Sequence, residues 1–240
     1  MPNNLYPERS DAVIEELATR LHLGYLNGSH YNPIPLKLPV PVEKIAEQFL
    51  GYEIEFSEIG IFSDPDTLGG IDFERNKIYV NASVADHDGR YSFTVAHELG
   101  HHVLHRKHYL QSQNMDDGEI LCRVRGQKPK IEIEADRFAA ALLMPAANVS
   151  NAIVGKTRDI RTIGQARALA NDLITKRGFS NVSNSAMVNR LKDLGILTKD
   201  IPYQGSKVRK TICRPSTLAY LRRCISKFRR IISNKVKPSV

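Results

Sequence analysis

The chain has 240 residues, of which 42% are hydrophobic and 25% are charged, a balance typical of a globular protein with one large domain or two small ones. No segment approaches the roughly 18 to 20 apolar residues that a membrane span requires, and residues 1–20 contain no apolar signal core. We therefore expect a soluble, cytoplasmic protein.

The net charge of +8 is concentrated at the end of the chain. Residues 201–240 contain 11 Lys or Arg and no acidic residue, whereas residues 1–200 contain 23 basic and 26 acidic residues. Apolar residues within 205–240 recur at spacings of three and four, which predicts a basic amphipathic helix. Such a tail could contact nucleic acid or an anionic membrane, or it could pack against the protein or remain solvated.

Apolar periodicity and turn residues predict the secondary structure. In chain order, the predicted elements are a helix at 11–26, a short helix from 42 that Gly51 ends, a strand at 52–56, a hairpin at 69–81, and helices at 91–104, 131–144, 159–177 and 183–194. This order predicts an α+β domain over residues 1–147. A helical region follows at 148–204, whose last two helices could pack together or form a DNA-reading helix-turn-helix.

Individual side chains refine these predictions. In the short helix, Ile45, Ala46 and Phe49 are expected on the inner face. Ser183 is expected to cap the last helix, and Gly195 to follow its end.

The helix at 91–104 carries an apolar stripe formed by Phe93, Ala96, Gly100, Val103 and Leu104. Ala96 and Gly100 make the middle of the stripe thin, so another element could pack closely against it. The same helix contains the sequence His97-Glu98-Leu99-Gly100-His101.

His97 and His101 are four residues apart, so on a helix both imidazoles can reach one metal ion. Glu98 lies one position round the helix, which suits a general base that takes a proton from metal-bound water. The three cysteines have no CxxC spacing and offer no cysteine zinc site. We predict a zinc site, although histidine and carboxylate ligands also accept other divalent ions.

A catalytic zinc site needs a third protein ligand. The candidates by residue type are His102, His105, His108, Asp116, Asp117, Glu119, Glu132, Glu134 and Asp136. His102 is turned away from the helix face that carries His97 and His101. His105 is two turns from His97, so we expect it to lie at the helix end or to contact a ligand from behind.

The choice narrows to Glu132 and Glu134 on the second helix, and we favour Glu132. Asp136 shares its face with Glu132 and is placed to accept the free N–H of a ligand histidine. Glu134 is expected to pair with Arg137 in solvent.

Two stretches resemble the ImmA/IrrE family of zinc metallopeptidases: FTVAHELGHHVLH at 93–105 and EIEADRFAAALLMP at 132–145. The resemblance implies a thermolysin-like zincin core with a small antiparallel sheet. It implies zinc ligands at His97, His101 and Glu132 and a base at Glu98. It also implies a substrate that is a DNA-binding repressor with a helix-turn-helix domain. The basic tail is not part of the pattern.

Two elements of the mechanism are expected outside the metal ligands. The hairpin near Ile78 to Asn81 could present a sheet edge to which an extended substrate adds as a strand. The group that stabilises the developing oxyanion is not fixed by the sequence. Its candidates are Tyr79, Tyr91, His105 and His108.

The leading hypothesis is a zinc endopeptidase that cleaves a regulatory protein. The alternatives are a zinc-stabilised regulator without catalysis, which binds DNA or sequesters a repressor, and a toxin-like component of a two-protein module. The basic tail and the possible helix-turn-helix favour the regulator, whereas Glu98 favours the enzyme.

Overall fold

The computed structural model describes residues 8–28, 37–57, 67–112, 130–154, 160–198 and 201. It divides into two compact units, one formed by Met1–Leu143 with Phe179–Val182 and the other by Met144–Gly178 with Ser183–Val240. The predicted basic helix within 205–240 lies outside the described residues. None of the described helices is long and apolar enough to cross a membrane.

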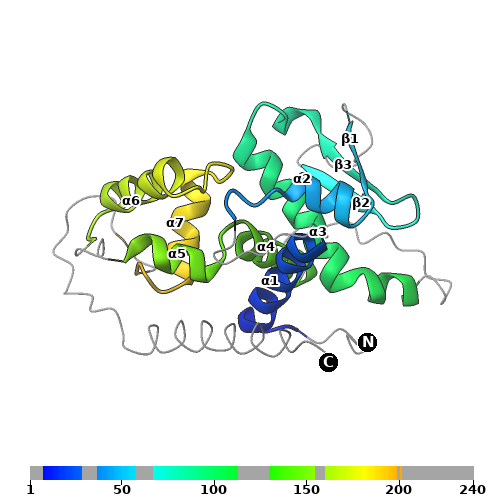
Figure 1. Cartoon of the computed structure of the whole chain (residues 1–240), viewed down its shortest axis with the longest axis horizontal. Helices are drawn as coiled ribbons and strands as arrows, with labels where there is room; N and C mark the ends of the chain where they lie inside the picture. The colour runs from blue at the N-terminus through cyan, green and yellow to red at the C-terminus, as the bar shows by residue number, and fades with distance from the viewer. Residues whose placement is uncertain are drawn as a thin grey trace, which may run out of the picture. The chain divides into compact units, whose positions relative to one another are not determined.

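The first unit combines helices with a three-stranded sheet (Figure 1). Its helices are α1 (Asp11–Gly28), α2 (Val42–Lys44), the π-helical turn η1 (Ile45–Phe49), the 3-10 turn η2 (Ala82–Val84), α3 (Asp88–Ser112) and α4 (Lys130–Leu143). Its strands are β1 (Glu53–Ser57), β2 (Gly69–Asp72) and β3 (Lys77–Asn81). The α+β prediction is therefore confirmed at this level.

The strand order is β1-β3-β2, with β3 in the centre. β2 and β3 form the predicted antiparallel hairpin, in which Ile71 pairs with Ile78, and Asn76 takes the positive φ of 53° that its turn needs. β1 runs parallel to β3, with Ile54 opposite Ile78. The expectation of an antiparallel sheet is thus wrong for β1, because alternation along a strand reveals its faces but not its direction.

One predicted inner residue of the short helix is on the surface. Ile45 and Ala46 are fully buried, but Phe49 is 41% exposed and its ring meets Tyr25 edge-on at a centroid distance of 6.3 Å. Residues 45–49 are π-helical, and the Leu50 N–H donates to the carbonyl oxygen of Ile45. A π-turn has more residues per turn than an α-helix, so the α-helical spacing fails at Phe49.

α3 is longer than predicted and is buried on more than one side. It packs against β2 and β3 as well as against α4 (Figure 1). Val95 and Leu99, which the predicted stripe omitted, are fully buried together with Ala96. The predicted stripe was too narrow because it assumed a single apolar neighbour.

α3 and α4 touch at Gly100, as the thin stripe predicted. A Cβ added to Gly100 would lie 3.1 Å from Ala135 Cα and 3.2 Å from the Ala135 carbonyl oxygen. Side-chain carbons normally pack at about 3.5 to 4.0 Å, so the missing side chain allows the backbones to approach. This contact sets the distance between the two helices that carry the predicted site residues.

The second unit contains α5 (Ala146–Ile153), α6 (Ile163–Lys176) and α7 (Asn184–Asp193). α5 was not predicted: Pro145 ends α4 as expected, and α5 begins directly after it, with Pro145 as its N-cap residue. The Ser183 hydroxyl accepts the N–H of Ala186 at the start of α7, and Gly195 follows its end with a φ of 67°, so both predictions for this helix are confirmed. Arg190 donates from Nε to the Met144 carbonyl oxygen at 2.9 Å.

Candidate metal centre

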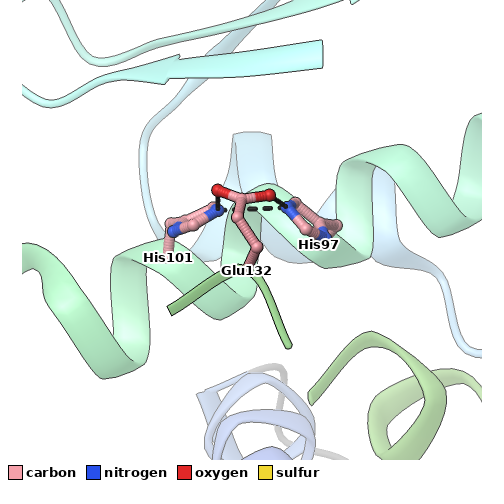
Figure 2. A group of neighbouring side chains, drawn as sticks. All are labelled: His97, His101 and Glu132. Carbon is pink, nitrogen blue, oxygen red and sulfur yellow. Dashed lines mark hydrogen bonds and ion pairs between the residues drawn. The ribbon is translucent and has the colours of Figure 1, made fainter. Parts of the chain in front are cut away.

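His97 and His101 lie one turn apart on α3 and turn their Nε2 atoms toward each other, 3.0 Å apart (Figure 2). Their side chains are 14% and 13% exposed. The spacing follows from the helix, which returns residues four apart to nearly the same face. Both rings therefore face one partly buried point that solvent can still reach.

Glu132, in the first turn of α4, closes this point from the neighbouring helix. Its Oε2 lies 3.3 Å from His97 Nε2 and its Oε1 lies 3.3 Å from His101 Nε2, and Figure 2 shows the carboxylate between the two rings. In a tetrahedral zinc site with bonds of about 2.1 Å, neighbouring ligand atoms are roughly 3.4 Å apart. The separation of the two imidazole nitrogens, the Glu132 carboxylate between them and the type of donor fit a single zinc ion, with one ligand atom from each residue within 4.8 Å of the others. Within the described part of the chain, His97, His101 and Glu132 are thus a group of three side chains that could hold a metal ion.

The electrostatics of the group suit a cation. Burial would raise the pKa of Glu132, but hydrogen bonds from His101 and His97 lower it well below its ordinary value. For His97, burial would lower the pKa, yet hydrogen bonds to Asp136 and Glu132 and the nearby carboxylate charges raise it to about 10. Without a metal ion, His97 therefore binds an extra proton, and this proton supplies the positive charge that the neighbouring carboxylates attract.

Asp136 holds His97 from behind. The Nδ1 of His97 lies 2.9 Å from Asp136 Oδ1, four residues along α4 from Glu132. When His97 donates its Nδ1–H to this carboxylate, the lone pair of Nε2 points at the common centre. The structure thus places Asp136 in the contact that the sequence predicted.

Glu98 is 4% exposed and lies on the side of α3 that faces β2. A Cβ added to Gly69 at the start of β2 would lie 3.2 Å from Glu98 Oε1 and 2.4 Å from Thr94 Cγ2. The glycine therefore lets the strand approach the helix closely beside Glu98. The carboxylate is next to the His97 and His101 pair in sequence but is not one of the three converging donors.

Glu134 differs from its prediction. It is 1% exposed, and its carboxylate accepts the Arg9 backbone N–H at 2.7 Å and the Arg9 guanidinium at 3.1 Å. Arg137 pairs with Asp11 at 3.0 Å instead. The expectation of a solvent-exposed Glu134–Arg137 pair is wrong because α1 and the residues before it cover this face of α4. Arg9 is 125 residues away in sequence, and no local pattern indicates the contact.

His102 and His105 occupy the positions that helix geometry predicts. The Tyr52 hydroxyl lies 2.7 Å from His102 Nδ1, away from the converging donors. His105 is buried, and its Nδ1 is 3.0 Å from His101 Nδ1. Burial, followed by the positive charges of His101 and Arg9, lowers the pKa of His105 to about 3. His105 is therefore a neutral group behind His101.

Among the oxyanion candidates, Tyr91 is engaged elsewhere. Its ring stacks on Phe56 with centroids 5.6 Å apart, and burial followed by a hydrogen bond with Glu43 raises the pKa of its hydroxyl. His108 is exposed near the end of α3, and Tyr79 lies in the central strand. None of these observations assigns the oxyanion-stabilising role to a particular residue, so that role stays a prediction.

The described structure thus contains a mixed α+β unit in which α3 and α4 bring His97, His101 and Glu132 together. Residues 59–173 match the family model Peptidase_M78, described as the IrrE N-terminal-like domain. The matched segment contains both motifs, so it confirms the resemblance to the ImmA/IrrE peptidase family that they carry. No curated protein matches the sequence.

Proposed function

We propose that the protein is a zinc-dependent endopeptidase with a thermolysin-like site, in which His97, His101 and Glu132 bind zinc and Glu98 is the general base. The observation that supports this most directly is the convergence of three ligand side chains, each offering one ligand atom within 4.8 Å of the others, in a domain of a peptidase family. Two imidazoles and a carboxylate are a ligand set of catalytic zinc sites, which keep the fourth position for water.

When bound, zinc supplies a Lewis acid that lowers the pKa of a coordinated water from about 15.7 toward about 7 and polarises the substrate carbonyl. The residues of the chain then have separate tasks. Glu98 accepts the proton of the attacking water and passes it to the leaving amine. Asp136 keeps the Nδ1 proton on His97, so that the ring does not lose its orientation during these transfers.

The substrate is proposed to bind along β2 rather than at Ile78 to Asn81. The prediction for that segment is wrong because β3 is the central strand and both its edges are occupied. β2 is an edge strand of the described sheet, and it begins at Gly69 beside Glu98. An extended peptide that adds to its outer edge would pass close to the proposed base.

The proposed substrate is a helix-turn-helix repressor, which would make the protein a cytoplasmic regulator of transcription; the support is the family resemblance. Direct contact of the basic tail with nucleic acid or an anionic membrane is proposed on charge alone. DNA reading by residues 148–204 is proposed because two helices there are separated by a short turn, as in a helix-turn-helix. The alternative without catalysis, a zinc-stabilised regulator or toxin-like component, would use the same metal centre for folding only.

The test is a comparison of the wild-type protein with Glu98→Gln. Each is co-expressed with the product of the neighbouring gene, and fragments are identified by mass spectrometry. The proposal expects both proteins to retain one zinc and only the wild type to produce fragments. Unchanged cleavage by Glu98→Gln would refute the assigned base. Regulation in cells that persists fully in Glu98→Gln, without any fragments, would favour the non-catalytic alternative.

A further inference from the structure

We propose that His105, Glu134 and Arg9 form a buried chain of polar contacts that fixes the tautomer and orientation of His101. The inference rests on the proposed role of His101 as a metal ligand. His97 has a carboxylate, Asp136, directly behind it at 2.9 Å. Behind His101 stands a second histidine, His105, and the carboxylate is one step further away.

The contact between the two Nδ1 atoms restricts where protons can be. At 3.0 Å, one Nδ1 must donate and the other must accept. His101 Nε2 faces the common centre, 3.3 Å from Glu132 Oε1, so a metal there requires a lone pair on Nε2 and a proton on Nδ1. His101 therefore donates to His105 Nδ1, and a neutral His105 carries its proton on Nε2.

A buried carboxylate lies beside the Nε2 of His105. Glu134 Oε2 lies 3.5 Å from His105 Nε2, and the two side chains are 5% and 2% exposed. The contact does not have the geometry of a hydrogen bond. The buried carboxylate nevertheless attracts an N–H at this distance electrostatically in a medium of low dielectric constant. Glu134 thus favours the one tautomer of His105 that can accept from His101.

Arg9 holds Glu134 and the end of this chain in place. Its backbone N–H and guanidinium both donate to the Glu134 carboxylate, which compensates for burying that charge. Its second guanidinium nitrogen donates to the Leu104 carbonyl oxygen at 2.8 Å, one residue before His105. Arg9 therefore connects the segment before α1 to both α3 and α4 behind His101.

The chain offers a matched pair of variants for the test. His105→Asn places an oxygen acceptor near the position of Nδ1, whereas His105→Leu has the same branched shape without an acceptor. Outer groups that orient a ligand contribute about 10- to 100-fold to metal affinity. We expect His105→Leu to weaken zinc binding by that factor and His105→Asn to restore most of the loss. Zinc affinity is measured on the full chain by competition with a chromophoric chelator.

The control is His102→Leu, which removes a half-buried histidine of the same helix that contacts Tyr52 instead of the centre. It should leave zinc affinity unchanged. Equal zinc affinity of His105→Leu and wild type would overturn this inference and leave the metal site intact. A His105→Asn variant as weak as His105→Leu would also overturn it, because the lost affinity would then reflect packing. Absence of zinc binding by the wild type would overturn the proposed function together with this inference.

A second measurement needs no variant. Long-range ¹H–¹⁵N correlation spectra of the zinc-bound protein distinguish the tautomers of histidine. We expect a proton on Nδ1 of His101 and on Nε2 of His105. A proton on Nδ1 of His105 would overturn the proposal even if His105→Leu failed to fold.

Discussion

The contact between α3 and α4 at Gly100 gives a prediction that links helix packing to metal binding. Gly100 precedes His101, and the Ala135 backbone that it meets precedes Asp136. In Gly100→Ala, the new Cβ would be 3.1 Å from Ala135 Cα, whereas carbon atoms pack at about 3.5 to 4.0 Å. The helices must therefore separate by about 0.4 Å or more, and α4 carries Glu132 away from the histidines.

Two opposing effects determine the stability of Gly100→Ala. Alanine in a helix is favoured over glycine by about 1 kcal/mol, and overpacking a close contact costs about 1 to 3 kcal/mol. We expect a net loss of about 1 kcal/mol in the free energy of unfolding of the zinc-free protein. We also expect zinc affinity to fall about tenfold, the lower end of the effect of disturbing the support of a ligand.

Urea unfolding followed by circular dichroism measures the first quantity, and chelator competition measures the second. Gly164→Ala is the control, because among the described residues its Cβ would meet only Thr162 Oγ1 within 4 Å, at 3.8 Å. That variant should be at least as stable as wild type and should bind zinc equally well. A Gly100→Ala protein with wild-type stability and zinc affinity would show that the helices are not held at contact distance.

Three further predictions concern the ligands and the buried histidines. Glu132→Gln should weaken zinc binding by more than the roughly 100-fold expected for an outer group, as measured by chelator competition; a smaller loss would remove Glu132 from the ligands. Because the pKa of His97 is raised to about 10, zinc binding at pH 7 should displace about one proton. Calorimetric titrations in buffers of different ionisation enthalpy count that proton, and none released would contradict the assignment. His22 is fully buried, and neither ring nitrogen has a hydrogen-bond partner among the described residues; burial lowers its pKa to about 4 from 6.5. Below pH 6.5 the unfolded chain binds a proton at His22 that the folded chain does not bind. Lowering the pH from 7 to 5 should therefore reduce the free energy of unfolding by about 2 kcal/mol. Urea unfolding of His22→Leu at both pH values should show a pH dependence that is smaller by this amount.

Much of the placement of the site follows from the sequence because it depends on helix periodicity. A spacing of four puts His97 with His101 on one face of α3, and Glu132 with Asp136 on one face of α4. The thin stripe at Gly100 further indicated where the second helix would pack. What these residues bind is still an inference from chemistry and family.

The features that the sequence did not reveal depend on contacts between distant segments. Nothing near Glu134 indicates that Arg9 covers it, so a buried carboxylate was interpreted as a surface one. The parallel direction of β1 depends on where β3 inserts, which alternation does not record. Phe49 was placed wrongly because the α-helical period does not hold through a π-turn.

The shortness of β2 has a consequence for the choice of substrate. A strand of four residues offers main-chain hydrogen bonds to only a few residues of a peptide laid along it, and such bonds are largely indifferent to side-chain identity. A folded protein would have to release an unstructured stretch before it could occupy that edge. Under the proposed function, selectivity among cellular proteins would then depend less on a cleavage motif than on which protein exposes a loose segment in the right cellular state.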